Sequence, residues 1–355
     1  MIVKNEEEVL DRCLSSIIDL IDEIIIVDTG STDRTKEIAI QYTDKVYDFE
    51  WVDDFSIARN YSFSKATKDY IMWLDADDIV PAESQHKIAE LKKILAELKP
   101  DSVMMVYQNS LDSDENTMLT IYRNRILKRQ CNFKWHGYVH EVIEVSGKVL
   151  KTDIAIKHKS ERRKSDRNIR IYEKAIAKGA TFSQRDILHY ANECLDHKYY
   201  EQAIHLYETI LAITNQDKEF KCYAIWKIAD TYINLKNYDK AIEYCLGSFK
   251  VDSPKAEICC RLATCFQLKN DIHQAISWYK IATTIEIPQL EDCGFPIFQE
   301  SCYTWIPHLK LCACYIYLED YSKAKVHNEL AEKYVPNSFA VKEYNRFLHE
   351  KHLES

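Results

Sequence analysis

Glycine and proline are scarce in this chain, with 6 and 7 among 355 residues. So few turn-forming residues, together with 23 tyrosines, favour helices over an all-β architecture. Long apolar runs are missing too, since none approaches the length of a bilayer span. Residues 1–5 lead directly into the acidic run 6–8, which is unlike a signal peptide. We therefore expect a cytoplasmic protein with no membrane span.

A basic excess is also lacking. The net charge is −9, which argues against a nucleic-acid binder. The twelve cysteines include no Cys-x-x-Cys pair, so neither a disulfide framework nor a cysteine zinc site is indicated, and most are predicted to be small buried hydrophobic residues. The length predicts two domains.

The first half of the chain alternates between strand and helix patterns. Residues 23–28 form a β-branched run typical of a strand buried on both faces, and 70–74 form a second one. Helical patterns occupy 7–19, 32–42, 54–66 and 83–97. This alternation predicts an α/β domain with a mostly parallel sheet, in which ligands bind at the carboxyl ends of the strands. Asp28 and the acidic loop 75–78 end the two runs and should lie at that edge.

Shorter strand patterns follow at 103–107, 118–122, 139–145 and 149–156. The segment 157–167 is basic and polar, and we place the domain boundary there. The predicted organisation is a catalytic domain at 1–160, a linker helix at 161–181 and a helical repeat domain at 182–350.

The second half is helical and repeats itself. Four alanines follow a similar local pattern, at positions Ala203, Ala241, Ala275 and Ala324. The spacing from Ala241 to Ala275 equals the 34-residue tetratricopeptide period. Thirteen residues before each alanine is an apolar residue followed by a small one, namely Ala191, Ala229, Ala263 and Cys312. Small residues at these positions let paired helices approach closely, so we predict tetratricopeptide repeats with an insertion around 287–303.

The acidic loop Asp-Ala-Asp-Asp at 75–78 is the most informative chemical feature. Three carboxylates at a strand end repel one another unless a cation neutralises them. Oxygen ligands of this kind suit Mg²⁺ or Mn²⁺, and such an ion can bind a diphosphate. A solvated acidic turn ahead of the helix near 83 is the alternative; the preceding buried strand and the earlier Asp28 favour the cation.

Four blocks of sequence together resemble the family 2 glycosyltransferases. They are Met1-Ile-Val-Lys-Asn-Glu6, Ile25-Ile-Val-Asp-Thr-Gly-Ser-Thr-Asp33, Ala58-Arg-Asn60 and Trp73-Leu-Asp-Ala-Asp-Asp78. The resemblance implies a GT-A fold and an inverting transfer from a UDP-sugar with Mn²⁺ or Mg²⁺. It also implies nucleotide contacts from Val3, Asn5, Asp28, Arg59 and Asp75, where Asp75 would meet the ribose or the metal. Asp77 and His158 would be metal ligands.

The segment Trp135-His-Gly-Tyr-Val-His-Glu141 is similar to the acceptor-side motif of bacterial members, in which Glu141 would be the general base. A base of this kind must face the acceptor nucleophile, and His140 and Glu141 would point to opposite faces if 139–145 is a strand. Further candidate contacts to the diphosphate or acceptor are Arg125, Trp135, His140, Arg162 and Arg163. For Arg125 a surface role is an equal alternative. For most of the basic stretch 157–164, a solvated linker is the favoured interpretation.

A repeat domain offers an extended surface for a peptide or protein acceptor. The two-part arrangement resembles bacterial peptide glycosyltransferases of the sublancin S-glycosyltransferase type, and also transferases that act on flagellin or on lipopolysaccharide sugars. The repeats can equally mediate self-association as a homodimer. Two other readings stay open: a nucleotidyltransferase, although no glycine precedes Gly30 to form its phosphate loop, and a non-catalytic scaffold with a degenerate transferase domain.

Overall fold

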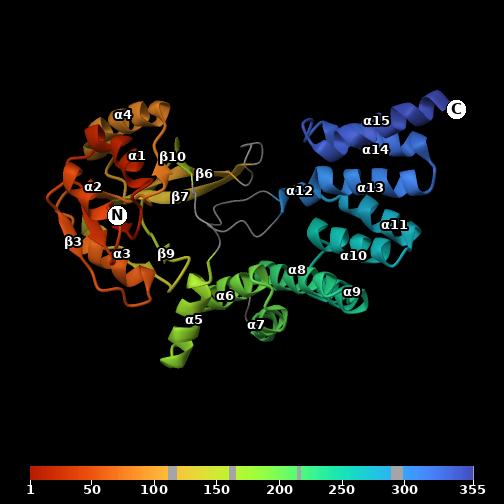
Figure 1. The fold of residues 1–355 in the computed structure, drawn as a ribbon, viewed down its shortest axis with the longest axis horizontal. Coiled ribbons are helices and arrows are strands. Elements are labelled where there is room, and N and C mark those ends of the chain that lie inside the picture. Colours follow the sequence, from red (N-terminus) through yellow and green to blue (C-terminus); the bar gives the residue numbers. More distant parts are fainter. Residues whose placement is uncertain (111–117, 160–164, 214–216, 289–298, 355) are drawn as a thin grey trace. The chain divides into compact units, whose positions relative to one another are not determined.

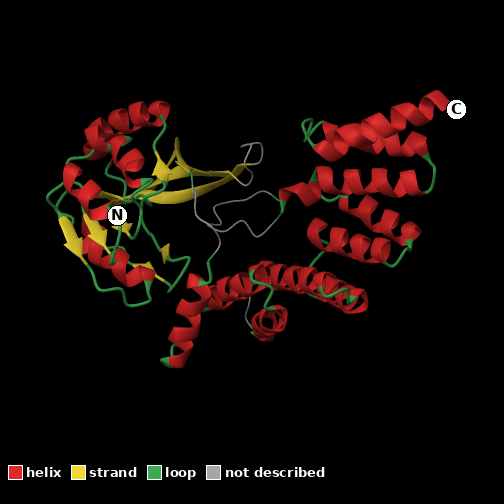
Figure 2. Cartoon of the chain, viewed as in Figure 1, coloured by secondary structure: helices red, strands yellow, loops and turns green. Residues whose placement is uncertain are grey.

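The computed structural model describes residues 1–110, 118–159, 165–213, 217–288 and 299–354. The chain divides into two compact units, Met1–Asp186 and Ile187–Ser355, which are described separately below (Figure 1). Among the described residues all strands lie in the first unit, and the second is built from helices (Figure 2). The predicted fold class, an α/β domain followed by an all-α repeat domain, is confirmed.

A small parallel sheet opens the first unit. Strand β2 (Ile26–Asp28) lies between β1 (Ile2–Val3) and β3 (Val46–Asp48). Val3, Asp28 and Asp48 stand in register, so the three carboxyl ends meet at one edge. The helices of this region are α1 (Leu10–Ser15), the 3₁₀ turn η1 (Ile18–Leu20), α2 (Thr35–Tyr42) and α3 (Phe55–Ser64). Leu10, Leu14 and Ala39 bury their side chains with Ile26, which excludes water from this layer.

A second sheet has five strands in the order β4-β7-β6-β10-β5. Their bounds are β4 (Tyr70–Met72), β5 (Asp78–Ile79), β6 (Ser102–Ser110), β7 (Met118–Lys128) and β10 (Val149–His158). Only the β6–β10 pair is parallel. The parallel sheet predicted for the alternating region is therefore found in β1–β3, whereas β4 pairs antiparallel with β7. Helix α4 (Ala82–Leu98) covers β10 and buries Ile88, Leu91 and Leu95.

The end of the first unit contains a two-stranded ribbon and one more helix. Strands β8 (Trp135–His136) and β9 (Val142–Ile143) pair antiparallel, so the strand expected at 139–145 is limited to β9. Helix α5 (Arg167–Ala177) lies within the segment predicted as a linker. Its Tyr172 is fully buried, and its Lys174 contacts Asp53 at 3.1 Å. Helix α5 therefore packs as part of the first unit.

The second unit repeats one turn geometry. Its helices are α6 (Gln184–Asp196), α7 (Tyr200–Ala212), α8 (Lys218–Asn234), α9 (Tyr238–Gly247), α10 (Ala256–Leu268), α11 (Ile272–Ala282), α12 (Glu300–Tyr303), α13 (Trp305–Tyr317), α14 (Tyr321–Glu332) and α15 (Phe339–Glu354), with a 3₁₀ turn η3 (Ser248–Lys250). Four corresponding turns contain a residue with φ between 58° and 64°, namely Lys198, Lys236, Asn270 and Glu319. In the last three, the next residue caps the following helix with its side chain.

The packing of these helices confirms the repeat pattern. All eight predicted small positions are fully buried: Ala191, Ala203, Ala229, Ala241, Ala263, Ala275, Cys312 and Ala324. The absence of side-chain bulk at these positions lets α8 pack on α9, α10 on α11 and α13 on α14. The described cysteines are all free thiols, buried apart from the half-buried Cys131, as the sequence predicts. None of the described helices combines the length and apolarity that a bilayer crossing requires.

Candidate active site

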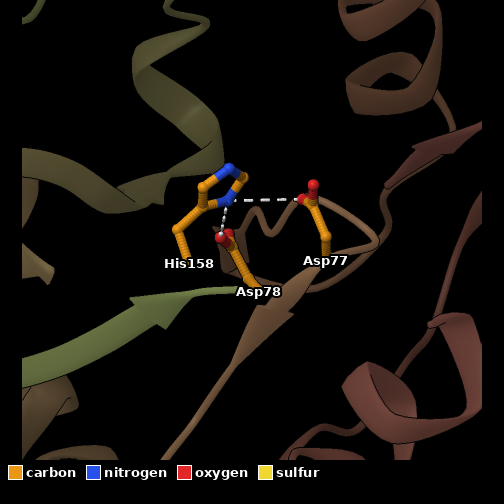
Figure 3. Close-up of side chains that lie close together, drawn as sticks. All are labelled: Asp77, Asp78 and His158. Carbon is orange, nitrogen blue, oxygen red and sulfur yellow. Dashed lines mark hydrogen bonds and ion pairs between the residues drawn. The ribbon is translucent and has the colours of Figure 1, made fainter. Parts of the chain in front are cut away.

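Two carboxylates and one imidazole gather where β5 meets β10. The antiparallel register places His158 opposite Asp78, and the Lys159 amide donates to the Asp77 carbonyl at 3.0 Å. His158 Nδ1 lies 3.3 Å from Asp78 Oδ1 and 3.4 Å from Asp77 Oδ1 (Figure 3). Asp77 and His158 are far apart in the sequence, and the pairing of β5 with β10 brings them together. Two residues predicted as metal ligands therefore lie close enough to bind one ion.

The donor set fits a divalent cation. One ligand atom from each of Asp77, Asp78 and His158 lies within 4.8 Å of the others. Carboxylate oxygen and imidazole nitrogen are ligands that Mn²⁺ accepts readily, and a cation would offset the excess negative charge. Asp78 was not among the predicted ligands. Its signal was present as the last acid of the Asp-Ala-Asp-Asp loop, but its inward orientation depends on β10.

The charges in this cluster shift both titrating neighbours. Burial, together with the charges of Asp75 and Asp78, raises the pKa of Asp77 above its ordinary value. Burial alone would lower the pKa of His158, but the hydrogen bond to Asp78 and the surrounding acids outweigh it and raise that pKa. Both shifts have the same origin, which is an excess of carboxylates in a partly buried place.

Arg59 joins the acidic loop to the predicted base. Helix α3 begins after Asp54, whose side chain accepts from the Ile57 amide and caps the helix. From the first turns of this helix, Arg59 donates through Nη2 to Asp75 Oδ1 at 2.6 Å and through Nε to Glu141 Oε1. Burial would lower the pKa of Arg59, but the two carboxylates outweigh it and raise that pKa. Burial would raise the pKa of Asp75, but the charges of Arg59 and Arg125 and the hydrogen bond from Arg59 together outweigh it and lower that pKa.

Two indole rings contact this arginine. The Arg59 guanidinium carbon lies 5.1 Å from the Trp73 ring centroid and 4.9 Å from that of Trp135. The rings meet edge to face, with centroids 4.8 Å apart. Asn60 fixes the Trp135 backbone from both sides, since it accepts from Trp135 N at 3.0 Å and donates to Trp135 O at 2.9 Å. Sequence reasoning missed this role of Asn60, although it belongs to the Ala-Arg-Asn block.

The base candidate lies in a turn between β8 and β9. Gly137 has φ of 101° and His140 has φ of 55°, so the chain reverses direction there. His140 is exposed, whereas the Glu141 side chain is 10% exposed. His140 and Glu141 precede strand β9, so strand alternation does not explain why their exposures differ. The tight turn accounts for the difference. Trp135 is buried, which leaves it as a wall of the arginine site.

The carboxyl ends of β1 and β2 form a second part of the site. Val3 O accepts hydrogen bonds from both the amide and the hydroxyl of Thr29. Asp28 is buried, and its Oδ2 accepts from the amides of Gly30 and Ser31 at 3.1 and 3.0 Å. Asp28 Oδ1 is also buried, yet it has no hydrogen-bond partner among the described residues. A buried acceptor without a donor is costly, so a ligand N–H would satisfy it.

A hollow of about 360 Å³ adjoins these strand ends. Asn5 and Asp77 both line it, so a predicted nucleotide contact and a predicted metal ligand share one surface. Asn5 has φ of 54°, and its Oδ1 accepts from the Thr32 amide at 2.8 Å, which fixes the loop after β1. The other lining residues are Glu6, Glu7, Glu8, Val9, Thr32 and Asp33.

The predicted arginine contacts have different outcomes. Arg125 is fully buried, which excludes the surface role left open for it, and it donates through Nη1 to Asp78 Oδ2 at 2.9 Å. It therefore supports the acidic loop from inside the protein. Arg162 and Arg163 lie outside the described residues. Arg123 instead lies beside the cluster: its guanidinium covers the Tyr107 ring at 4.4 Å, and that ring contacts His158 at 5.6 Å.

Comparison with known proteins identifies the two parts. Residues 1–146 match glycosyl transferase family 2. The first domain is a family 2 glycosyltransferase domain. Residues 223–253 match a tetratricopeptide repeat. The family 2 match contains Asp77, Arg59 and Glu141, whereas His158 lies beyond it.

Curated relatives match parts of the chain. The SPbeta prophage-derived glycosyltransferase SunS of Bacillus subtilis is 34% identical over 143 residues, which is 40% of this chain and 33% of that protein. A TPR repeat-containing protein of Synechococcus elongatus is 51% identical over 78 residues, which is 22% of this chain and 19% of that protein. The chain thus spans a third or less of the length of these relatives. The solved structure of YrrB, a TPR protein, covers 51% of this chain and 83% of its own at 14% identity, with a TM-score of 0.36.

Proposed function

We propose that this protein is a metal-dependent inverting glycosyltransferase that moves a sugar from a UDP-sugar to a side chain of a peptide or protein. The observation that carries the proposal is the cluster of Asp77, Asp78 and His158, beside a hollow that Asp77 shares with Asn5. The family 2 match of residues 1–146 supports the same chemistry.

Each end of the donor has a complementary group. The buried and unpartnered Oδ1 of Asp28 suits the N–H of a uracil ring, and Asn5 and Val3 lie at the adjoining strand end. Asp77, Asp78 and His158 would hold Mn²⁺ or Mg²⁺. A cation bound there supplies charge neutralisation for the diphosphate leaving group.

Glu141 is assigned as the base of the transfer. The acceptor oxygen or sulfur forms a bond to the anomeric carbon, the bond from that carbon to the diphosphate oxygen breaks, and its electron pair leaves with the UDP. The acceptor proton passes to Glu141, whose carboxylate accepts a hydrogen bond from Arg59 Nε. Attack opposite the leaving group inverts the anomeric centre.

The repeats are assigned to acceptor binding. Stacked helical repeats present an extended surface, which suits a polypeptide better than a small sugar. A cytoplasmic location agrees with the absence of a membrane-crossing helix among the described residues. Self-association of the repeats as a homodimer would compete with peptide binding for the same surface.

The test is a screen of UDP-sugars for hydrolysis with Mn²⁺, Mg²⁺ or chelator. We expect metal-dependent release of UDP from at least one donor, and its loss in Asp77→Asn. Asp153→Asn serves as the matched control, because Asp153 is exposed and pairs only with Lys87 in the described contacts. Peptides and lipopolysaccharide sugars are then compared as acceptors. UDP release that Asp77→Asn leaves intact would contradict the proposed site, and calorimetry showing no heat with UDP and Mn²⁺ would favour a non-catalytic scaffold.

A further inference from the structure

Arg59 is shared between two carboxylates that belong to opposite sides of the proposed reaction. Asp75 belongs to the loop that carries the donor-side acids, and Glu141 belongs to the acceptor-side turn. The side-chain exposures are 11% for Arg59, 25% for Asp75 and 10% for Glu141. Charge-assisted hydrogen bonds in such a partly buried place are strong, so the three side chains hold one another in position.

The guanidinium is held in one orientation by its surroundings. Trp73 and Trp135 contact it with adjoining rings, whose centroids lie 5.1 and 4.9 Å from the guanidinium carbon. Its Nε and Nη2 point to different carboxylates, an arrangement that a planar fork can make and a lysine ammonium cannot reproduce with the same directions. Asn60, the next residue on α3, fixes the Trp135 backbone, so helix α3 sets both the arginine and the wall behind it.

We propose that Arg59 is the positioning residue of the base: it orients the Glu141 carboxylate and links it mechanically to Asp75 on the donor side. The inference rests on the proposed function. It differs from the nucleotide contact that the family resemblance implies for this arginine, because Nε and Nη2 donate to the two carboxylates. A donor that moves Asp75 therefore also moves the hydrogen bond to the base.

A nucleotide-binding role and a base-positioning role of Arg59 would change different kinetic parameters. A nucleotide contact acts on donor affinity, whereas positioning of the base acts on the chemical step. In Arg59→Lys we expect kcat for donor hydrolysis to fall about tenfold or more, since correctly positioned general bases contribute that much or more. The donor KM and the affinity for UDP with Mn²⁺, measured by calorimetry, should stay within about threefold of wild type.

The pH profile provides a readout that a merely structural role would not move. Glu141 faces Arg59 from α3 and interacts electrostatically with Arg185 at the start of α6, and the exposed His140 precedes it in the same turn. Arg59→Gln, unlike Arg59→Lys, removes the closest cation, which disfavours the ionised base. The acid limb of kcat should therefore move to higher pH in Arg59→Gln.

A double-variant cycle tests whether the two residues act as a unit. Arg59→Lys combined with Glu141→Gln should be no slower than Glu141→Gln alone, because a positioning residue has nothing left to position. Trp135→Phe is the second variant, in case Arg59→Lys folds poorly. It removes one wall of the arginine site, and we expect the same fall in kcat with unchanged KM, at smaller amplitude.

The outcomes separate this inference from the proposed function. An active wild type in which Arg59→Lys or Trp135→Phe raises donor KM tenfold with kcat unchanged overturns the positioning role alone. Losses that multiply in the double variant overturn it as well. A wild type that releases no UDP from any donor overturns the proposed function and this inference together.

Discussion

Arg125 and Asp78 form an ion pair in which both side chains are fully excluded from solvent, with Nη1 2.9 Å from Oδ2. The guanidinium also lies over the Trp73 ring at 3.8 Å and donates to the Trp73 carbonyl. Its Nε and Nη2 are buried without a hydrogen-bond partner among the described residues. The acidic loop thus has an internal counter-charge, which holds Asp78 in place from inside the protein.

Removing only the arginine should be costly. Arg125→Met leaves Asp78 buried without its partner, so we expect the free energy of unfolding to fall by about 3–5 kcal/mol. Urea denaturation followed by circular dichroism measures this. Arg125→Met with Asp78→Asn should recover much of the loss. The exposed Arg129→Met is the control, and a cost for Arg125→Met as small as that of the control would argue against the pair.

Asp77 should tolerate the loss of its charge when no metal is bound. The raised folded pKa of Asp77 means that its ionised form destabilises the fold, and that this penalty grows as the pH rises from the ordinary value of 3.8 through the folded pKa. Asp77→Asn should therefore leave the apo protein as stable as wild type or more so at pH 7. It should nevertheless abolish stabilisation by Mn²⁺, which for wild type at a hundred times Kd is about 2.7 kcal/mol. Thermal unfolding with and without Mn²⁺ checks both statements, and a wild-type melting temperature indifferent to Mn²⁺ would contradict the metal site.

The repeat unit should tolerate added volume only outside its small positions. Ala241 is fully buried where α9 packs against its neighbours, so Ala241→Leu should lower the free energy of unfolding by about 1–3 kcal/mol. Ala212 is exposed at the end of α7, and Ala212→Leu is the matched control with little expected effect. Chemical denaturation of the two variants distinguishes the sites. Equal costs would mean that close helix approach does not depend on Ala241.

A histidine pair should make the repeat unit sensitive to acid. Nδ1 of His308 on α13 lies 3.1 Å from Nδ1 of His327 on α14, and burial together with the charges of His308 and Lys280 lowers the pKa of His327 to about 4. The unfolded chain, with an ordinary histidine pKa of 6.5, binds the proton first as the pH falls. Stability should therefore be full above pH 6.5 and should decline toward pH 4.

The pair is half-exposed, so after allowance for solvent screening we expect a loss of roughly 1 kcal/mol between pH 7.5 and 5. Urea midpoints of wild type and His327→Gln at the two pH values measure this contribution. The variant should show a shallower dependence on pH, and parallel curves for the two proteins would refute the assignment.

The features that sequence predicted best are local or periodic. The small residues of the repeats recur at fixed spacing because each helix pair solves the same packing problem, and every one of them is buried. The acidic end of β2 was predictable because the apolar run 24–27 stops at Asp28, the last residue of that strand. Both inferences need only the residues near them in the chain.

The features that sequence could not give depend on distant partners. The Arg59–Glu141 contact joins residues 82 positions apart, and nothing local marks the arginine as a partner of the base. The sequence left a surface role open for Arg125, because its burial depends on β6 and on the indole of Trp73. The antiparallel pairing of β4 with β7 likewise follows from tertiary arrangement, which periodicity does not encode.

The two indoles that contact Arg59 give this protein a natural optical probe. Tryptophan emission responds to nearby charge and to the polarity around the ring, and Trp73 and Trp135 both contact the same guanidinium. Any titration that displaces Arg59 from Asp75 or Glu141 should therefore appear as a change in fluorescence, without a dye or a radioactive sugar. Replacing each indole in turn by phenylalanine would show from which ring the signal arises.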